Sequence, residues 1–183
     1  MTTNKTRQLV TAAVLLALTL VFQNIRLLIG VNPISTYLTG TLVNLCLIVA
    51  TVLVNLWAGL LISIAAPLIA LLQGFAQAPM LPFIMLGNGV LVILYGLIVT
   101  PVFQKDGKLR PVSFGIAGIL STILKFAVMA AGNALVLSAK QGKAFQVMLA
   151  AGAAAQVQQL VTALIAMALG FVVLPSVHKA RKE

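Results

Sequence analysis

The sequence is nearly free of acidic residues. Only two of its 183 residues are acidic, Asp106 and Glu183, against 12 lysines and arginines, and it holds one cysteine, Cys46, and one histidine. A carboxylate pair, a metal-ligand cluster or a nucleophile with its base cannot be built from so few groups. We therefore expect no enzyme activity, no metal site and no cofactor, and the lone cysteine excludes a disulfide framework.

Charge of any kind is also scarce away from a few basic clusters. Charged residues make up 8% of the chain and hydrophobic residues 61%, with a formal net charge of +10 and a mean hydropathy of +1.13. In a soluble protein this charge would suggest nucleic acid, but basic loops between apolar spans are the ordinary topology signal of membrane proteins. The basic and aromatic modules of nucleic-acid binders are missing. We expect membrane lipid around the chain and no nucleic-acid partner.

Long apolar runs predict an all-α integral membrane protein whose single transmembrane domain covers residues 1–183. A basic N-terminus precedes the first run, but no small-residue cleavage site follows it, so we expect this run to be a retained span. The run 41–72 would form a helix of about 48 Å, longer than a hydrocarbon core of about 30 Å, so it must fold back near residues 55–59, with Trp57 at the interface. We thus expect six transmembrane helices, at about residues 8–29, 41–56, 57–72, 82–103, 112–137 and 145–174.

The distribution of basic residues predicts how these helices are oriented. With the fold-back near Trp57, one side of the membrane holds eight of the 12 basic residues. Because lysine and arginine concentrate in cytoplasmic loops, both termini are expected in the cytoplasm. The eight are Lys5, Arg7, Lys105, Lys108, Arg110, Lys179, Arg181 and Lys182.

Polar side chains inside the apolar runs mark the candidate functional site. Pro82 suits a helix start, and Asn88 then lies about 9 Å into that helix, where no water can satisfy its amide. Lys125 lies about halfway along the run 112–137. A buried ammonium is by default a functional hypothesis, with snorkelling or a carbonyl partner as the alternatives. The predicted substrate-binding residues are Asn24, Arg26, Asn44, Asn88, Lys125, Asn133, Gln156 and Gln159.

For the amides, hydrogen bonding between helices remains an equal alternative to ligand contact. Two segments rich in glycine, proline and glutamine, residues 30–40 and 73–79, are expected outside the membrane on the same side as this site. Their adaptable backbone predicts a lid over it. The gating candidates are Asn32, Tyr37, Gln77 and Pro79.

Three features together resemble a known family. These are six short helices with both ends inside, the run Leu9-Val-Thr-Ala-Ala-Val-Leu-Leu-Ala17, and the pattern Pro79-x-x-Pro82 followed after five residues by Asn88. They resemble the substrate-binding S components of energy-coupling factor (ECF) transporters, which belong to the ATP-binding cassette importers of the bacterial cell membrane. The resemblance implies a subunit that captures a vitamin or related micronutrient outside and reorients to deliver it inside. It also implies a coupling transmembrane subunit and two ATPase subunits as partners, with Ala13 and Ala17 on the docking face.

Within that family, the residues present exclude substrates better than they identify one. A thiamin site is expected to offer an acid, and nickel or cobalt members resemble chains with a Met-His start, whereas this chain has neither feature. The loop after the first helix also does not resemble the one usual in riboflavin binders. An amide-rich pocket lined by small residues suits a large, amide-bearing ligand such as cobalamin, with pantothenate, flavin and haem as alternatives.

Two other classes of function remain open. A stand-alone secondary carrier or channel would need an internal repeat or a coupling-ion site, and no convincing repeat is present. A scaffold subunit without a ligand would use its polar residues only for packing. Uptake assays with and without ATPase partners, and ligand-induced stabilisation of the purified chain, distinguish these classes.

Overall fold

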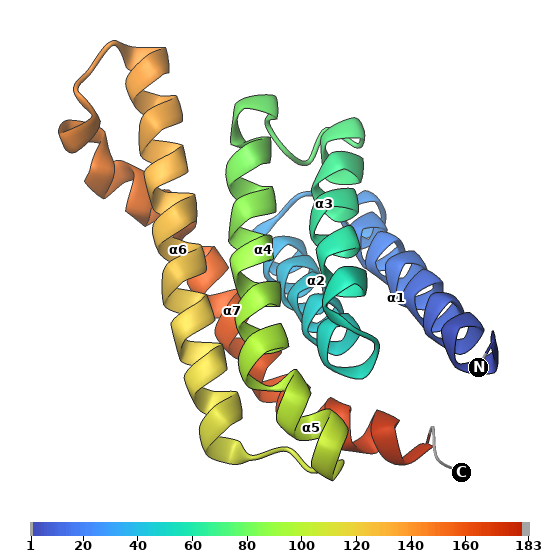
Figure 1. Cartoon of the computed structure of the whole chain (residues 1–183). Coiled ribbons are helices and arrows are strands. Elements are labelled where there is room, and N and C mark those ends of the chain that lie inside the picture. The colour runs from blue at the N-terminus through green and yellow to red at the C-terminus, as the bar shows by residue number, and fades with distance from the viewer. Residues whose placement is uncertain (1, 181–183) are drawn as a thin grey trace.

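The computed structural model describes residues 2–180 and shows a bundle of helices (Figure 1). Five helices in this part of the chain are long and apolar enough to cross a membrane, and a sixth, α3, is apolar but shorter, at 17 residues. The expected all-α membrane architecture of about six helices is confirmed. The elements are α1 (Thr2–Ile29), α2 (Pro33–Leu53), α3 (Leu56–Leu72), the 3-10 helix η1 (Ala78–Met80), α4 (Leu81–Ile98), α5 (Thr100–Asp106), α6 (Pro111–Gln141) and α7 (Phe145–Ala180).

The long apolar run folds back at the start of the expected turn, residues 55–59. α2 ends at Leu53 and α3 begins at Leu56, so the turn consists of Val54 and Asn55. The Asn55 side chain accepts a hydrogen bond of 2.9 Å from the Ala58 N–H and so caps the first turn of α3. Trp57 lies in that first turn and is 76% exposed.

The start of α2 differs from the expectation. It begins at Pro33 instead of about residue 41, so most of the expected lid segment 30–40 is helical and Tyr37 belongs to α2. The cause is a capping box in which the Asn32 side chain accepts from the Ser35 N–H and the Ser35 hydroxyl accepts from the Asn32 N–H. Pro33 follows at the first helical position, where its missing N–H costs nothing.

Other boundaries also differ from the expected ranges, and α1 begins at Thr2 instead of about residue 8. The helix expected at 82–103 is divided at Val99 into α4 and α5, two residues before Pro101, whose ring nitrogen has no hydrogen to donate. α6 extends to Gln141 and ends at Gly142, whose φ of 65° is left-handed. α7 continues past Pro175 to Ala180. Its last turns are held by packing, because the His178 ring contacts the Phe103 ring of α5 at 4.9 Å.

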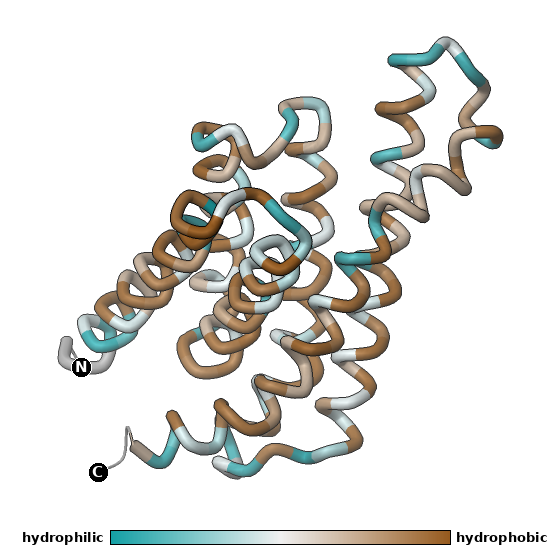
Figure 2. The backbone as a smooth tube through the Cα atoms, turned by 180° about the vertical axis from the view of Figure 1, so that it is seen from behind, coloured by the Kyte–Doolittle hydropathy of each residue, from teal (hydrophilic) through white to brown (hydrophobic). Residues whose placement is uncertain are grey.

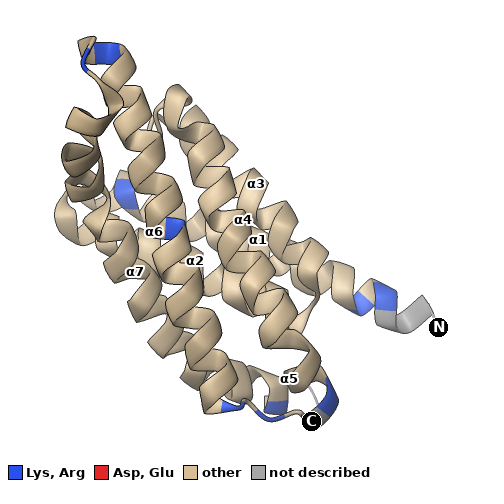
Figure 3. Cartoon of the chain, turned by 60° about the vertical axis from the view of Figure 1, so that its left-hand side comes forward, with Lys and Arg blue, Asp and Glu red and all other residues tan. Residues whose placement is uncertain are grey.

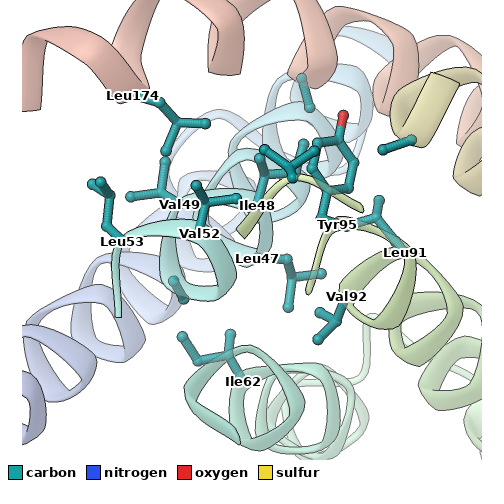
Figure 4. Packing of buried hydrophobic residues seen from close by; sticks show 14 of the residues in the cluster. Leu47, Ile48, Val49, Val52, Leu53, Ile62, Leu91, Val92, Tyr95 and Leu174 are labelled. Carbon is teal, nitrogen blue, oxygen red and sulfur yellow. The ribbon is translucent and has the colours of Figure 1, made fainter. Parts of the chain in front are cut away.

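α2 lies at the centre of the bundle. It packs against α1, α3, α4, α5 and α7, whereas the helices that α1 packs on in the described residues are mainly α2 and α3. Its side chains Leu47, Ile48 and Val52 are fully buried. Around them lie Ile62 of α3, Leu91, Val92 and Tyr95 of α4, and Leu174 of α7 (Figure 4).

α6 and α7 form a long hairpin that extends beyond the other helices at the end opposite α5 (Figure 1). Polar residues gather at its tip and at the other helix ends, while the helix middles are mostly apolar with a few hydrophilic positions along the hairpin (Figure 2). The two helices approach closely at Gly152, where an added Cβ would lie 2.7 Å from the Ala130 carbonyl oxygen. Small residues therefore serve close helix packing at this position.

The basic residues are concentrated at one end of the bundle. The first turns of α1, α5 with the loop after it, and the end of α7 carry most of the lysines and arginines drawn in Figure 3. The tip of the α6 and α7 hairpin carries a smaller group, and single cations lie between these ends. Arg181, Lys182 and Glu183 lie outside the described residues. In the described part of the chain, the basic residues near the N-terminus and those near the C-terminus thus lie at the same end of the bundle as α5.

Candidate functional site

The candidate site is a cavity of about 420 Å³ between the long helices at the end opposite α5. It is bordered by the end of α1, the start of α2, the end of α3, the segment 75–77, the start of α4, the second half of α6 and the first half of α7. We call it the polar cavity. Its polar lining consists of Gln23, Arg26, Thr36, Thr39, Asn44, Gln77, Asn88, Lys125, Asn133, Gln156, Gln158 and Gln159.

Lys125 lies at the centre of a hydrogen-bonded network in the cavity wall. Its side chain is 3% exposed, and Nζ donates to Asn44 Oδ1 at 2.6 Å and to Asn88 Oδ1 at 2.8 Å. Asn44 Nδ2 in turn donates a hydrogen bond of 3.4 Å to Thr162 Oγ1. These four residues, the lysine network, connect α6, α2, α4 and α7.

Gly87 makes room for the lysine network. It precedes Asn88 on α4, and an added Cβ would lie 3.3 Å from Cγ of Lys125 and 3.3 Å from Cγ of Met129. That distance is tighter than ordinary van der Waals contact, so a larger residue would displace one of the two side chains. The glycine thereby lets the Lys125 stem pass close to α4 and reach the Asn88 oxygen.

The α1 wall of the cavity holds two polar atoms without hydrogen-bond partners. Gln23 is 6% exposed, and its Nε2 donates to the Ala66 carbonyl at 2.9 Å. Its Oε1 is buried and has no partner, and the same is true of Arg26 Nε. The Arg26 guanidinium lies over the Phe75 ring, 5.6 Å from its centre. A buried polar group without a partner is unusual and calls for a ligand, water or ion beside it.

The structure brings seven of the eight predicted binding residues to this cavity. Asn24 does not line it. Its Nδ2 donates to the Leu20 carbonyl within α1, and its Oδ1 accepts from Gln73 Nε2 at 3.1 Å, which joins α1 to the end of α3. Its observed contacts are of the interhelical kind that the sequence left open as an alternative.

Of the four gating candidates, only Gln77 lines the polar cavity. Its Oε1 accepts a hydrogen bond of 3.0 Å from Lys140 Nζ, which joins the segment before α4 to the end of α6. Asn32 caps α2, Tyr37 is on the exposed side of α2, and Pro79 is exposed in η1. Of the two expected lid segments, the second therefore lies at the cavity through residues 75–77, whereas the first is reduced to residues 30–32.

Sequence reasoning missed four polar residues of the lining. These are Gln23, Thr36, Thr39 and Gln158. For Gln23 the signal was present, because residues three apart share a helix face, and Gln23 is three residues before Arg26. Asn24 is two residues before Arg26, and residues two apart lie on different faces of a helix.

Ala13 and Ala17 lie on the outer face of α1. Both are exposed, as are Leu9, Val10 and Val14 near them. The structure therefore does not support the alternative, in which the two alanines pack against other helices of this chain. Their face of α1 is free for lipid or for another protein.

The cavity wall offers hydrogen bonds and positive charge. Within the described residues it has no carboxylate, and of the two acids in the sequence, Asp106 is in α5 at the opposite end of the bundle. No three His, Cys, Asp or Glu side chains of residues 2–180 gather where they could ligate a metal ion. The arrangement suits noncovalent binding of a small polar molecule, because amides, hydroxyls and two cations surround a partly open cavity.

Comparison with known proteins gives one finding. The family model described as "ECF transporter, substrate-specific component" matches residues 7–178. Neither the curated proteins nor the solved structures yielded a match. The matched range includes every residue of the lysine network and nearly all of the helical bundle.

Proposed function

This chain belongs to the family of substrate-specific components of ECF transporters, and from that premise we propose that its polar cavity captures a vitamin or related micronutrient outside the cell. Members of this family are multi-pass proteins of the bacterial cell membrane that work with transmembrane and ATPase components of the transporter. The observation that carries the proposal is a 420 Å³ polar cavity inside a bundle of span-length apolar helices. Such a cavity within a membrane bundle is the expected place for a bound polar ligand.

The proposed orientation follows from the basic residues. They are concentrated at the α5 end (Figure 3), and lysine and arginine concentrate in cytoplasmic loops. The polar cavity lies towards the opposite end, so it would face the outside, where an importer meets its substrate. Both termini would then be cytoplasmic.

Delivery into the cell would depend on partner subunits. We propose that the chain docks on the coupling transmembrane subunit through the exposed face of α1 around Ala13 and Ala17, and that two ATPase subunits drive the release of substrate inside. Small side chains let another helix approach closely, which suits a docking face. The two Gly-Lys pairs of the sequence, at 107–108 and 142–143, lack the following serine or threonine of a phosphate-binding loop, which is consistent with an energy source on other subunits.

The cavity volume bears on the choice of substrate. Sites for drug-sized ligands measure about 300–1,000 Å³, and the polar cavity lies in the lower part of that range. Cobalamin, which the amide-rich lining favours, remains a prediction from the sequence, and a corrinoid would need the cavity to widen. A micronutrient of smaller size fits the cavity without that change.

Reconstitution tests the proposed function. Purified chain is first denatured, and the compound released is identified by mass spectrometry and its visible spectrum. Uptake of that compound is then measured in liposomes holding the chain with its coupling and ATPase subunits. We expect uptake only with all subunits and ATP. Uptake by the chain alone under an ion gradient would favour a secondary carrier, and the absence of any bound or stabilising compound would favour a scaffold.

A further inference from the structure

The ammonium of Lys125 has one hydrogen-bond donor more than the lysine network uses. A lysine ammonium carries three N–H donors, and among the described residues two acceptors are recorded, Asn44 Oδ1 and Asn88 Oδ1. Lys125 also borders the polar cavity. The third donor is therefore available to a molecule in the cavity.

The positive charge of Lys125 also has no counterpart in the cavity. Both amide oxygens are neutral, and no carboxylate lies in the described part of the cavity wall. Lys125 is 3% exposed, so solvent compensates little of this charge. A buried cation without a counterion is unfavourable in a medium of low dielectric constant. A neutral ligand would leave this charge uncompensated, whereas an anionic ligand would neutralise it.

Arg26 adds a second cation to the same cavity. Its Nε is buried and without a partner, and its guanidinium is positioned over the Phe75 ring. An arginine fork suits carboxylates and phosphates because their oxygens match its spacing. Three residues before it on the same helix face, the buried Gln23 Oε1 lacks a donor. A ligand beside the α1 wall would therefore supply an acceptor for Arg26 Nε and a donor for Gln23 Oε1.

We propose that the polar cavity selects micronutrients that carry a carboxylate or phosphate group. Lys125 and Arg26 bind the anionic group or groups, and Gln23 accepts a hydrogen bond from an N–H or O–H elsewhere on the molecule. This assignment rests on the proposed function and narrows its substrate class. A cavity with this selectivity would distinguish an acid from the amide or alcohol that is otherwise identical to it.

The test uses pairs of compounds that differ in charge. Purified protein in detergent is titrated with pantothenate and panthenol, nicotinate and nicotinamide, biotin and its amide, and pyridoxal 5′-phosphate and pyridoxal, and stabilisation is followed by thermal melting. In parallel, compounds that co-purify with the protein are identified by mass spectrometry. We expect the co-purified compound to be anionic at pH 7, and any pair that binds to favour the anion by about 10- to 100-fold, the scale of a hydrogen bond to a charged group.

Variants then assign this preference to the two cations. Lys125→Gln and Arg26→Gln should each reduce the preference for the anion over its neutral partner, with less effect on the neutral compound. A lysine needed only for packing would weaken both members of a pair alike. Arg26→Gln keeps the test valid if Lys125→Gln does not fold, because Arg26 is less buried. The matched control is Lys143→Gln, which removes an exposed cation near the same end of the bundle, outside the cavity.

The outcomes separate this inference from the proposed function. A co-purified compound that is neutral or cationic, a corrinoid included, would overturn the anion assignment while the binding function stands. Equal binding of both members of a pair, or an unchanged preference in both variants, would also overturn it. If nothing co-purifies and no compound stabilises the protein, both proposals are overturned.

Discussion

The Lys125 ammonium nitrogen lies 2.8 Å from the Asn88 side-chain oxygen, so one hydrogen bond joins the middle of α6 to the first half of α4. The same nitrogen reaches α2 through Asn44 at 2.6 Å. Both bonds border the polar cavity. A change in the cavity therefore acts directly on the contacts that hold three helices together.

We predict that Lys125→Ala and Asn88→Ala each weaken substrate binding, by about 1–3 kcal/mol, because each removes a buried partner and leaves another polar group unpaired. Calorimetry with the co-purified compound measures the effect. Since the two residues contact each other, the double variant should lose less than the sum of the single losses. Unchanged affinity in both folded single variants would contradict the placement of the site.

Gln23→Ala should weaken binding, whereas Asn24→Ala should leave it nearly unchanged. Gln23 lines the cavity with a partnerless oxygen, and Asn24 instead bonds to Leu20 and Gln73 outside it. The two substitutions are matched in position and chemistry, and both affinities come from the same titration. Equal losses would indicate that α1 acts on the site through its packing alone.

Hydrogen exchange should slow in two segments when substrate binds, residues 30–32 and 73–77. Both are connections between helices at the cavity end, and their backbone is less protected by regular helical bonds than that of α2 or α4. The segment 33–40 should already be protected without ligand, because it is the first part of α2. Protection confined to residues 107–110, at the other end, would contradict this assignment.

Ala13→Leu combined with Ala17→Leu should abolish co-purification with the ATPase complex and leave ligand affinity in detergent intact. Both alanines are exposed, so added bulk meets no part of this chain. The matched control is Ala151→Leu with Ala154→Leu, two exposed alanines on α7. If the α1 variant assembles and transports normally, this face contacts lipid only.

Gly152→Ala should destabilise the protein, because its Cβ would lie 2.7 Å from a backbone oxygen of α6, which cannot move aside alone. We expect a loss of about 1–3 kcal/mol, the usual cost of overpacking, seen as a lower melting temperature in detergent. Gly115→Ala is the control. An added Cβ there meets nothing within 4 Å, so it should be neutral or stabilise by about 0.5–1 kcal/mol. Equal melting temperatures for the two variants would contradict the tight contact.

Much of the helical architecture follows from the sequence, because apolar length is a direct consequence of the bilayer. That the run 41–72 must fold back was predictable from its length alone, and Asn55, Trp57 and Gly59 indicated where. The start of α2 could also have been predicted, because Asn32, Pro33 and Ser35 form a helix-capping signature. The prediction of a loop at residues 30–40 did not use it. α7 continues past Pro175 and its last turns contact Phe103 through the His178 ring, a contact that no local signal reveals.

The candidate site was predictable in its residue types more than in its contacts. Asn88 and Lys125 stood out because polar groups in apolar helices are costly, and the structure brings them within hydrogen-bond distance. That Asn44 would be the second acceptor depended on how α2 packs between α4 and α7, which the sequence does not state. Gln23 was missed and Asn24 chosen, although the helical period alone distinguishes them.

The lysine network has a direction along the chain. Its two acceptors, Asn44 and Asn88, both precede Lys125, and Thr162 follows. Proteins are synthesised from the N-terminus, so both amide oxygens have left the ribosome before the ammonium does. Helices that enter the membrane in the order of synthesis would thus supply Lys125 with both acceptors as α6 arrives, and this order would ease the assembly of the cavity during biogenesis.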